Sequence, residues 1–157
     1  MDEKGVIDMT DLAKGIIEIN GFTVKHGTTL AEMQSFFGNK VRVLNLSTGP
    51  RLKLETPFYL SNTFHAYAFN FNEKGALTHF SLTPDIPAEL SGEYEEIAKY
   101  KLTAAKQWLK GMVNTQPEED EESVIYSYDW GYIVSLVSHD RDYGLRGGEI
   151  IIRFREG

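Results

Sequence analysis

Apolar and polar residues alternate with a period of two through the stretch VIYSYDWGYIVSLVSH, residues 124–139. Neighbouring side chains on a β-strand point to opposite faces, so this pattern predicts one long strand. The stripe is expected to face the core, and the alternative is that its four aromatic residues form a binding platform. Its members are Tyr126, Tyr128, Trp130, Tyr132, Val134 and Leu136.

Two pairs of alternating segments near the start of the chain are each separated by turn-forming residues. Asn20-Gly21 divides GIIEI from FTVK and is a strong hairpin signal, because both residues tolerate the positive φ of a type I′ turn. A second hairpin is predicted for residues 41–46 and 51–55, on either side of the turn sequence STGP.

A third hairpin is predicted to join residues 62–71 to residues 76–83 through the turn NEKG. Both faces of its first strand are largely apolar, so this strand is expected at the centre of a sheet rather than at an edge. One predicted face carries His65, Tyr67, Phe69 and Phe71, and the other carries Phe64, Ala66, Ala68 and Asn70.

Two helices are predicted from helical spacing and capping residues. Thr29 and Glu32 form a capping box before a short helix at about 30–37. Ser91 is a suitable N-cap for a long helix at about 92–112, with glutamates in its first turn and lysines near its end. Strands and helices do not alternate one by one. The expected fold class is therefore α+β, an antiparallel sheet of about six to eight strands with both helices packed against it.

Length and composition narrow the class of protein. The 157 residues suit a single α+β domain, assigned to 15–157, with 1–14 as a loose N-terminal leader. The chain contains no cysteine, which excludes disulfides, thiolate nucleophiles and thiolate-bound metals. Its start lacks the features of a secretory signal, and no apolar run reaches the roughly 18 residues of a membrane span. We therefore expect a cytoplasmic protein without a membrane partner.

The charge of the chain is negative and unevenly distributed. A net charge of −7 disfavours nucleic acid as a partner, because phosphate contacts need concentrated lysine and arginine. Residues 118–122 read EEDEE, whereas residues 40–53 contain four basic residues and no acid. The acidic run is interpreted either as a solvated loop or as a surface that attracts a basic protein partner.

Few residues are spaced for catalysis or cofactor binding. No histidine lies three or four residues from another, so the sequence contains no local metal-ligand pair among His26, His65, His79 and His139. His65 and His79 could meet across the third hairpin. Gly-x-Ser-x-Gly and phosphate-binding glycine loops are absent. No catalytic residue, metal or cofactor is predicted.

The polar loop DRDYGLRG, residues 140–147, precedes a last strand with Ile150, Ile152 and Phe154 in one stripe. Tyrosine and arginine are enriched where protein interfaces concentrate their binding energy, so the loop is either a binding site or an ordinary hairpin tip. Together with the acidic run it supplies the predicted partner-binding residues: Asp140, Arg141, Asp142, Tyr143, Arg146, Glu118, Glu119, Asp120, Glu121 and Glu122.

Two segments resemble known protein families. The C-terminal part, with Trp-Gly before an alternating strand, an Asp/Arg/Gly turn and then EIIIRF, is similar to the ending of many small bacterial immunity proteins, which neutralise toxins delivered between neighbouring cells. KHGTTLAEMQSFFG resembles the Gly-x-Thr helix opening of small lipoprotein domains related to β-lactamase inhibitor proteins. The first resemblance implies a cytosolic acidic protein that blocks its partner by surface complementarity.

The expected function is a non-catalytic protein-binding domain, of the immunity type, that neutralises a basic toxin or nuclease. The alternative is a small-molecule or lipid-binding domain, or a small enzyme, with a cavity between the sheet and the long helix. The residues expected to line that cavity are Tyr67, Phe69, Trp108 and Tyr128. The sequence does not predict the oligomeric state.

Overall fold

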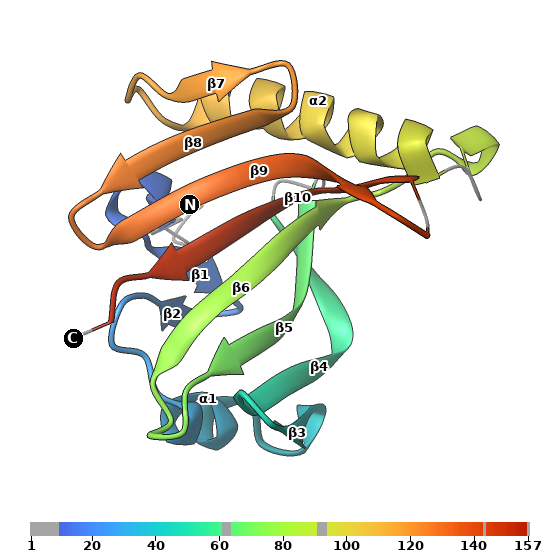
Figure 1. The fold of residues 1–157 in the computed structure, drawn as a ribbon. Coiled ribbons are helices and arrows are strands. Elements are labelled where there is room, and N and C mark those ends of the chain that lie inside the picture. Colours follow the sequence, from blue (N-terminus) through green and yellow to red (C-terminus); the bar gives the residue numbers. More distant parts are fainter. Residues whose placement is uncertain (1–9, 61–63, 91–93, 143, 157) are drawn as a thin grey trace, which may run out of the picture.

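The computed structural model describes residues 10–60, 64–90, 94–142 and 144–156, apart from the side chain of Asp140. The fold is α+β, as predicted, with an eight-stranded antiparallel sheet, a separate two-stranded hairpin and two α-helices (Figure 1). The strand order of the large sheet is β3 (Val41–Leu46), β4 (Gly49–Leu60), β5 (Phe64–Phe71), β6 (Leu77–Pro84), β10 (Gly144–Phe154), β9 (Gly131–Asp140), β8 (Ser123–Tyr128) and β7 (Glu118–Asp120).

Two meanders of four strands make up the large sheet. Strands β3 to β6 pair in chain order, and strands β7 to β10 do the same. The meanders meet where β6 pairs with β10, with Leu82 opposite Ile150 and His79 opposite Arg153. Helix α2 (Tyr94–Met112) connects the two meanders, and it packs mainly along β10 and β9 (Figure 1).

The N-terminal segment folds as predicted into a hairpin and a short helix. Strands β1 (Ile17–Ile19) and β2 (Phe22–Val24) are joined by Asn20 and Gly21, whose φ values are 49° and 91°. Helix α1 (Leu30–Phe37) begins with the capping box: the Glu32 N–H donates to Thr29 Oγ1 at 3.1 Å, and the Thr29 N–H donates to Glu32 Oε1 at 3.0 Å. The described residues also form three short 3-10 helices: η1 (Leu12–Lys14), η2 (Gly38–Lys40) and η3 (Ala88–Leu90).

Both α-helices and the β1–β2 hairpin pack on one face of the large sheet. Leu12, which the sequence places in the leader, is 1% exposed in this core, while residues 1–9 lie outside the described part. The helix and hairpin side chains meet alternate residues of the strands in one apolar cluster. It includes Ile17, Ile19, Met33, Leu52, Phe69, Phe80, Leu109, Ile133, Ile150 and Ile152.

Residues 124–139 form two strands, so the prediction of a single strand was wrong. Strand β8 ends at Tyr128 and β9 begins at Gly131, with a two-residue turn between them. Gly131 has a φ of 153°, and a Cβ atom there would lie 2.0 Å from the carbonyl oxygen of Arg153. Glycine is required at this close approach. The turn itself reads Asp-Trp, which is not one of the dipeptides that favour a tight hairpin. The alternation of apolar and polar residues continues through it, and for this reason the sequence predicted one strand.

This hairpin divides the predicted apolar stripe between the two faces of the sheet. Residues opposite each other in an antiparallel pair lie on the same face. Tyr126 is opposite Ile133 and both are buried in the core. Tyr132 and Leu136 therefore lie on the other face, where they are 38% and 41% exposed.

The predicted faces of β5 also need correction. A β-bulge shifts the pairing register between His65 and Phe69, so the alternation changes phase within the strand. Tyr67 is 44% exposed and does not share a face with Phe69. The prediction that β5 lies inside the sheet is confirmed. The core side of the strand carries Phe64, Ala66, Phe69 and Phe71.

Two loops are shorter than predicted. Residues 118–120 of the acidic loop form β7, the strand at one edge of the sheet. At the predicted eight-residue tip, β9 continues to Asp140 and β10 begins at Gly144, so only residues 141–143 remain between them. Both polar stretches are thus mostly part of the sheet.

Candidate functional site

The candidate site lies on the face of the large sheet opposite the core cluster, here called the uncovered face. Among the described residues, the two α-helices and the β1–β2 hairpin all lie on the core side. A row of polar side chains crosses five neighbouring strands of the uncovered face, with one residue from each strand. We call it the central row: Arg51 in β4, Asn70 in β5, His79 in β6, Arg153 in β10 and Tyr132 in β9.

Burial of the neighbouring residues holds the central row on this face. Each member precedes or follows a core residue in its strand, and side chains alternate between the two faces. The five core neighbours are at most 1% exposed, and turning any strand over would place an apolar side chain in water. They are Leu52, Phe69, Phe80, Ile152 and Ile133.

Asn70 links the two neighbouring strands within the row. The Arg51 Nε–H donates to Asn70 Oδ1 at 3.0 Å, and Asn70 Nδ2 donates to the His79 carbonyl oxygen at 3.4 Å. The Arg51 side chain is thereby held across the sheet. In the described part of the chain, neither Arg51 nor Arg153 forms an ion pair with a carboxylate.

A chain of hydrogen bonds sets the proton position on the His79 ring. The Thr78 hydroxyl donates to the Asn70 carbonyl oxygen at 3.0 Å and lies 3.0 Å from His79 Nδ1. Since a hydroxyl has one hydrogen, its oxygen accepts from Nδ1–H, and Nε2 carries the lone pair in the neutral ring. Burial, followed by the positive charges of Arg153 and Arg51, lowers the pKa of His79 below its usual value.

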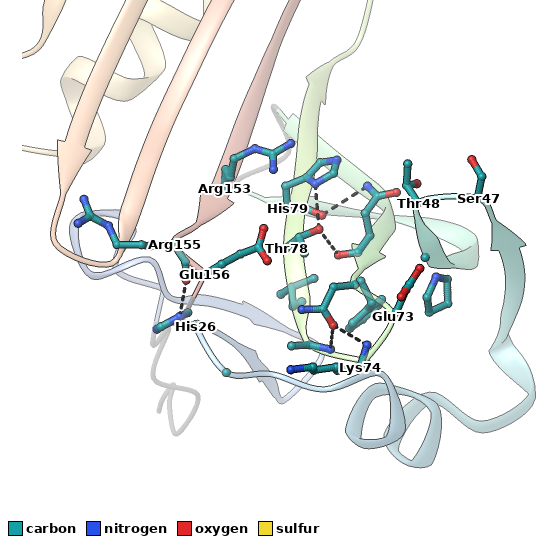
Figure 2. Close-up of a pocket in the computed structure, with 18 residues that line it drawn as sticks. His26, Ser47, Thr48, Glu73, Lys74, Thr78, His79, Arg153, Arg155 and Glu156 are labelled. Carbon is teal, nitrogen blue, oxygen red and sulfur yellow. Dashed lines mark hydrogen bonds between the residues drawn. The ribbon is translucent and has the colours of Figure 1, made fainter.

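Two depressions meet at the central row. The larger, of about 940 Å³, is walled by the β3–β4 turn, the β5–β6 turn, the end of β10 and the segment around His26 (Figure 2). Figure 2 shows the Arg153 guanidinium beside the His79 ring at one end of this depression. The smaller, of about 420 Å³, contains Arg51 and shares Asn70 with the larger one. The row is therefore open to a ligand from both sides.

Acidic residues also line these depressions, but they do not neutralise the two arginines. Glu149 is held by Lys101, whose Nζ lies 2.6 Å from its Oε2. Glu73 and Glu156 line the larger depression, and no described basic group lies within ion-pair distance of either. Two guanidinium groups without a described ion-pair partner therefore lie at the centre of the uncovered face, in a protein whose net charge is −7.

The acidic run that the sequence predicted as a partner site lies at the edge of the sheet, away from the central row. Glu119 accepts from Lys110 of α2 at 3.1 Å, and Lys106 donates to the Asp120 carbonyl oxygen. Glu122 lies 3.3 Å from His139 of β9. These contacts attach the run to the protein's own helix and strand, while its other members, Glu118 and Glu121, are exposed.

The predicted residues at the β9–β10 tip are only partly described. Tyr143 and the side chain of Asp140 lie outside the described residues. Arg141 and Asp142 are exposed, and the Arg146 guanidinium lies 5.6 Å from the centre of the Tyr94 ring. The contact between Glu122 and His139 places the acidic run next to the β9–β10 end of the sheet.

The four residues predicted to line a cavity are not brought together. Phe69 packs on Phe80 in the core at 5.0 Å between ring centres, and Trp108 packs on Phe64 at 4.7 Å. Tyr128 stacks on Trp130, and Tyr67 lies on the uncovered face, 5.8 Å from the Lys53 ammonium. The space between the sheet and α2 is occupied by core side chains, including Ala105 and Leu109.

The central row was not predicted from the sequence, which singled out some of its members separately and did not single out Arg153. Residues 40–53 stood out as basic, and His79 was considered only as a partner of His65. Arg153 alternates with Ile152 and Phe154, which marks it as facing away from the core. What brings these residues together is strand order and register, which alternation does not determine.

No group of three or more His, Asp or Glu side chains in the described ranges is placed to hold a metal ion. No helix of those ranges is long and apolar enough to cross a bilayer. Comparison of the chain with protein-family models, with curated proteins and with solved structures finds no match in any of the three.

Proposed function

We propose that the chain is a non-catalytic protein-binding domain that binds its partner with the uncovered face of the sheet. The observation that carries the proposal is the central row, which places two guanidinium groups and an imidazole on one open face, without ion-pair partners among the described carboxylates. Clustered cations repel one another, and a negative surface opposite them relieves this repulsion.

Exposed aromatic and aliphatic side chains extend this face beyond the row. Tyr67, Tyr132 and Leu136 are each more than a third exposed, and Lys53 lies over the Tyr67 ring. Tyrosine and arginine are the residue types that most often carry binding energy at protein interfaces. A mixed surface of this kind favours a folded protein partner over a small apolar ligand.

The proposed partner is acidic at the surface that meets the central row. This differs from the basic partner predicted from the sequence, which would bind the acidic run at the β7 edge. That run already contacts Lys106, Lys110 and His139, so less of its charge is available to a partner. If the partner is a toxin, as the resemblance to immunity proteins implies, the uncovered face is the surface that would block it.

The test is a charge reversal with a matched control. The tagged wild-type protein, an Arg51→Glu/Arg153→Glu variant and a Lys25→Glu/Lys40→Glu control are used to capture proteins from the cells that make them. Lys25 and Lys40 are exposed and lie outside the central row, and both variants change the net charge equally. We expect wild type and control to retain the same partner in a salt-dependent manner, and the arginine variant to lose it.

A third variant, Glu118→Lys/Glu121→Lys, separates the two surfaces. Loss of the partner in this variant alone would move the site to the acidic run and refute the proposal. Circular dichroism of each variant shows whether the fold is retained. Retention of the partner by a folded Arg51→Glu/Arg153→Glu variant would also refute it.

A further inference from the structure

We propose that the central row contains a phosphate-binding site, in which His79 Nε2 and the guanidinium group of Arg153 hold a tetrahedral dianion, while Arg51, on the other side of Asn70, adds positive charge. The proposal rests on the proposed function, because it specifies the chemistry that the uncovered face recognises on its partner. A phosphate group has three acceptor oxygens and a charge near −2, which suits several cationic donors converging from different strands.

The geometry leaves the right donors available. Arg51 uses its Nε–H on Asn70, and no described residue accepts from its terminal nitrogens. Arg153 forms neither a hydrogen bond nor an ion pair with any side chain in the described ranges. A guanidinium with two free N–H groups binds phosphate oxygens in a bidentate manner, which a lysine ammonium cannot do.

His79 makes the site sensitive to protonation. Its Nδ1–H is used on Thr78, so Nε2 is an acceptor in the neutral ring and a donor only in the imidazolium. Without an anion, burial and the two arginines favour the neutral ring. A bound dianion reverses this preference, because it accepts from Nε2–H and offsets both positive charges.

The other charged groups around His79 do not supply such an anion. From β4 and β10 the facing groups are Arg51 and Arg153, and from β5 the facing group is the neutral Asn70. Beyond β10, Arg155 and Glu156 line the same depression, as do Glu73 and Lys74 of the β5–β6 turn and His26. The lowering of the His79 pKa comes from burial, Arg153 and Arg51, and neither glutamate offsets it.

Anion binding and protonation of His79 favour each other. The pKa of His79 is lowered from an ordinary value of about 6.5, so the ring is neutral at pH 7 in the free protein. A bound anion raises this pKa. At a pH between the His79 pKa of the free protein and that of the complex, binding therefore takes up a proton. Affinity therefore increases as the pH falls through that window, by at most about tenfold per pH unit because one proton is involved.

Nuclear magnetic resonance of the histidine ring protons tests the site directly. Sulfate serves as the probe because it stays a dianion over the pH range in which histidine titrates, about 5 to 8. We expect sulfate to raise the pKa of His79, with smaller changes in the ring-proton resonances of His139 and His26, and no such effect from sodium chloride at equal ionic strength. Sulfate that shifts His79 no more than His139 would overturn the proposal.

Variants show whether the arginines hold the anion. Arg153→Gln should abolish the sulfate-dependent shift, whereas Lys110→Gln removes one exposed positive charge elsewhere and should leave it intact. An unchanged shift in a folded Arg153→Gln protein would show that the anion is held elsewhere and would overturn the assignment. Acetate as effective as sulfate would also overturn it, because any carboxylate would then suffice.

Two further probes identify the source of the phosphate. Inorganic phosphate and a phosphoserine peptide are compared, with the unphosphorylated peptide as control. Tighter binding of the phosphopeptide indicates a phosphorylated partner, and equal binding indicates a free phosphate compound; both outcomes support the site. If sulfate and phosphate fail while partner capture still depends on the two arginines, this inference falls and the proposed function stands.

Discussion

Trp130 shows how a residue that resembles a binding aromatic has a structural role. Its ring lies against Gly15, where an added Cβ atom would be 2.8 Å from Cδ2, and its Nε1–H donates to the Ala13 carbonyl oxygen at 2.9 Å. It also stacks on Tyr128 at 5.3 Å and meets Phe154 at 5.5 Å between ring centres. The side chain ties the β8–β9 turn to the N-terminal segment.

Trp130→Ala should therefore lower the free energy of unfolding by about 3 kcal/mol, the lower end for truncation of a large aromatic residue, because the ring is only partly buried. Trp130→Phe keeps part of the packing but loses the hydrogen bond to Ala13, and should cost less. Urea denaturation of the three proteins measures both losses. A Trp130→Ala protein as stable as wild type would show that the contacts with Gly15 and Phe154 do not hold the turn.

At the residue scale, what the sequence could predict depends on how local the interaction is. The Asn20-Gly21 turn and the Thr29–Glu32 capping box involve residues within three positions of each other, so their chemistry is visible in the sequence. The proximity of His79 to Arg153 depends on which strands are neighbours and in which register. No property of either residue carries that information.

At the scale of elements, helix α2 is held close to strand β10 at one glycine. A Cβ atom on Gly148 would lie 2.6 Å from the Ala98 carbonyl oxygen and 3.1 Å from the Leu102 nitrogen. The bulge between Gly147 and Ile150 also directs the Gly148 carbonyl oxygen to the Ser135 hydroxyl at 2.8 Å. The close approach of α2 to β10 is thus possible only because residue 148 has no side chain.

Gly148→Ala should destabilise the fold both by backbone strain and by pushing α2 from the sheet. Gly144→Ala is the matched control. Both glycines have positive φ, +92° and +79°, but no described residue outside its chain neighbours lies within 4 Å of a Cβ on Gly144. We expect the control to lose about 1 kcal/mol and Gly148→Ala to lose about 2 kcal/mol more. Thermal unfolding followed by circular dichroism compares them. Equal losses would mean that the helix yields at no cost.

The hairpins joined by Asn, Gly or Pro turns were predictable because those residues interrupt the apolar pattern. The hairpin of β8 and β9 was not, because its Asp-Trp turn contains no such signal and the alternation continues across it. The bulge in β5 likewise leaves no mark in the sequence, although it moves Tyr67 onto the uncovered face. Apolar alternation thus identifies strands but not the face of each residue.

At the scale of the whole molecule, the two edges of the large sheet differ in charge. Strand β3 forms one edge, and β7, with the sequence Glu-Glu-Asp, forms the other. Charged side chains on an edge strand discourage pairing with a second sheet. The charges of β7 therefore disfavour edge-to-edge pairing of two sheets at this end. From the sequence, the acidic run was interpreted only as a solvated loop or a partner site.

Removing these charges should allow association through the β7 edge. We expect Glu118→Thr/Glu119→Thr to show a mass that increases with concentration in analytical ultracentrifugation, since threonine favours strands and carries no charge. Glu89→Gln/Glu96→Gln removes the same charge from exposed positions outside the sheet and should leave the mass unchanged. Association in both variants would instead point to net charge as the cause.

The pairing of β6 with β10 also determines the order in which the sheet can be completed during synthesis. Each meander closes through short turns, so its hairpins can form as soon as their own strands have been made. The free side of β6 has to wait for β10, which is made only after α2 and strands β7 to β9. Until then the backbone groups of β6 that later pair with β10 form an open edge in the nascent protein, which is free to pair with another strand.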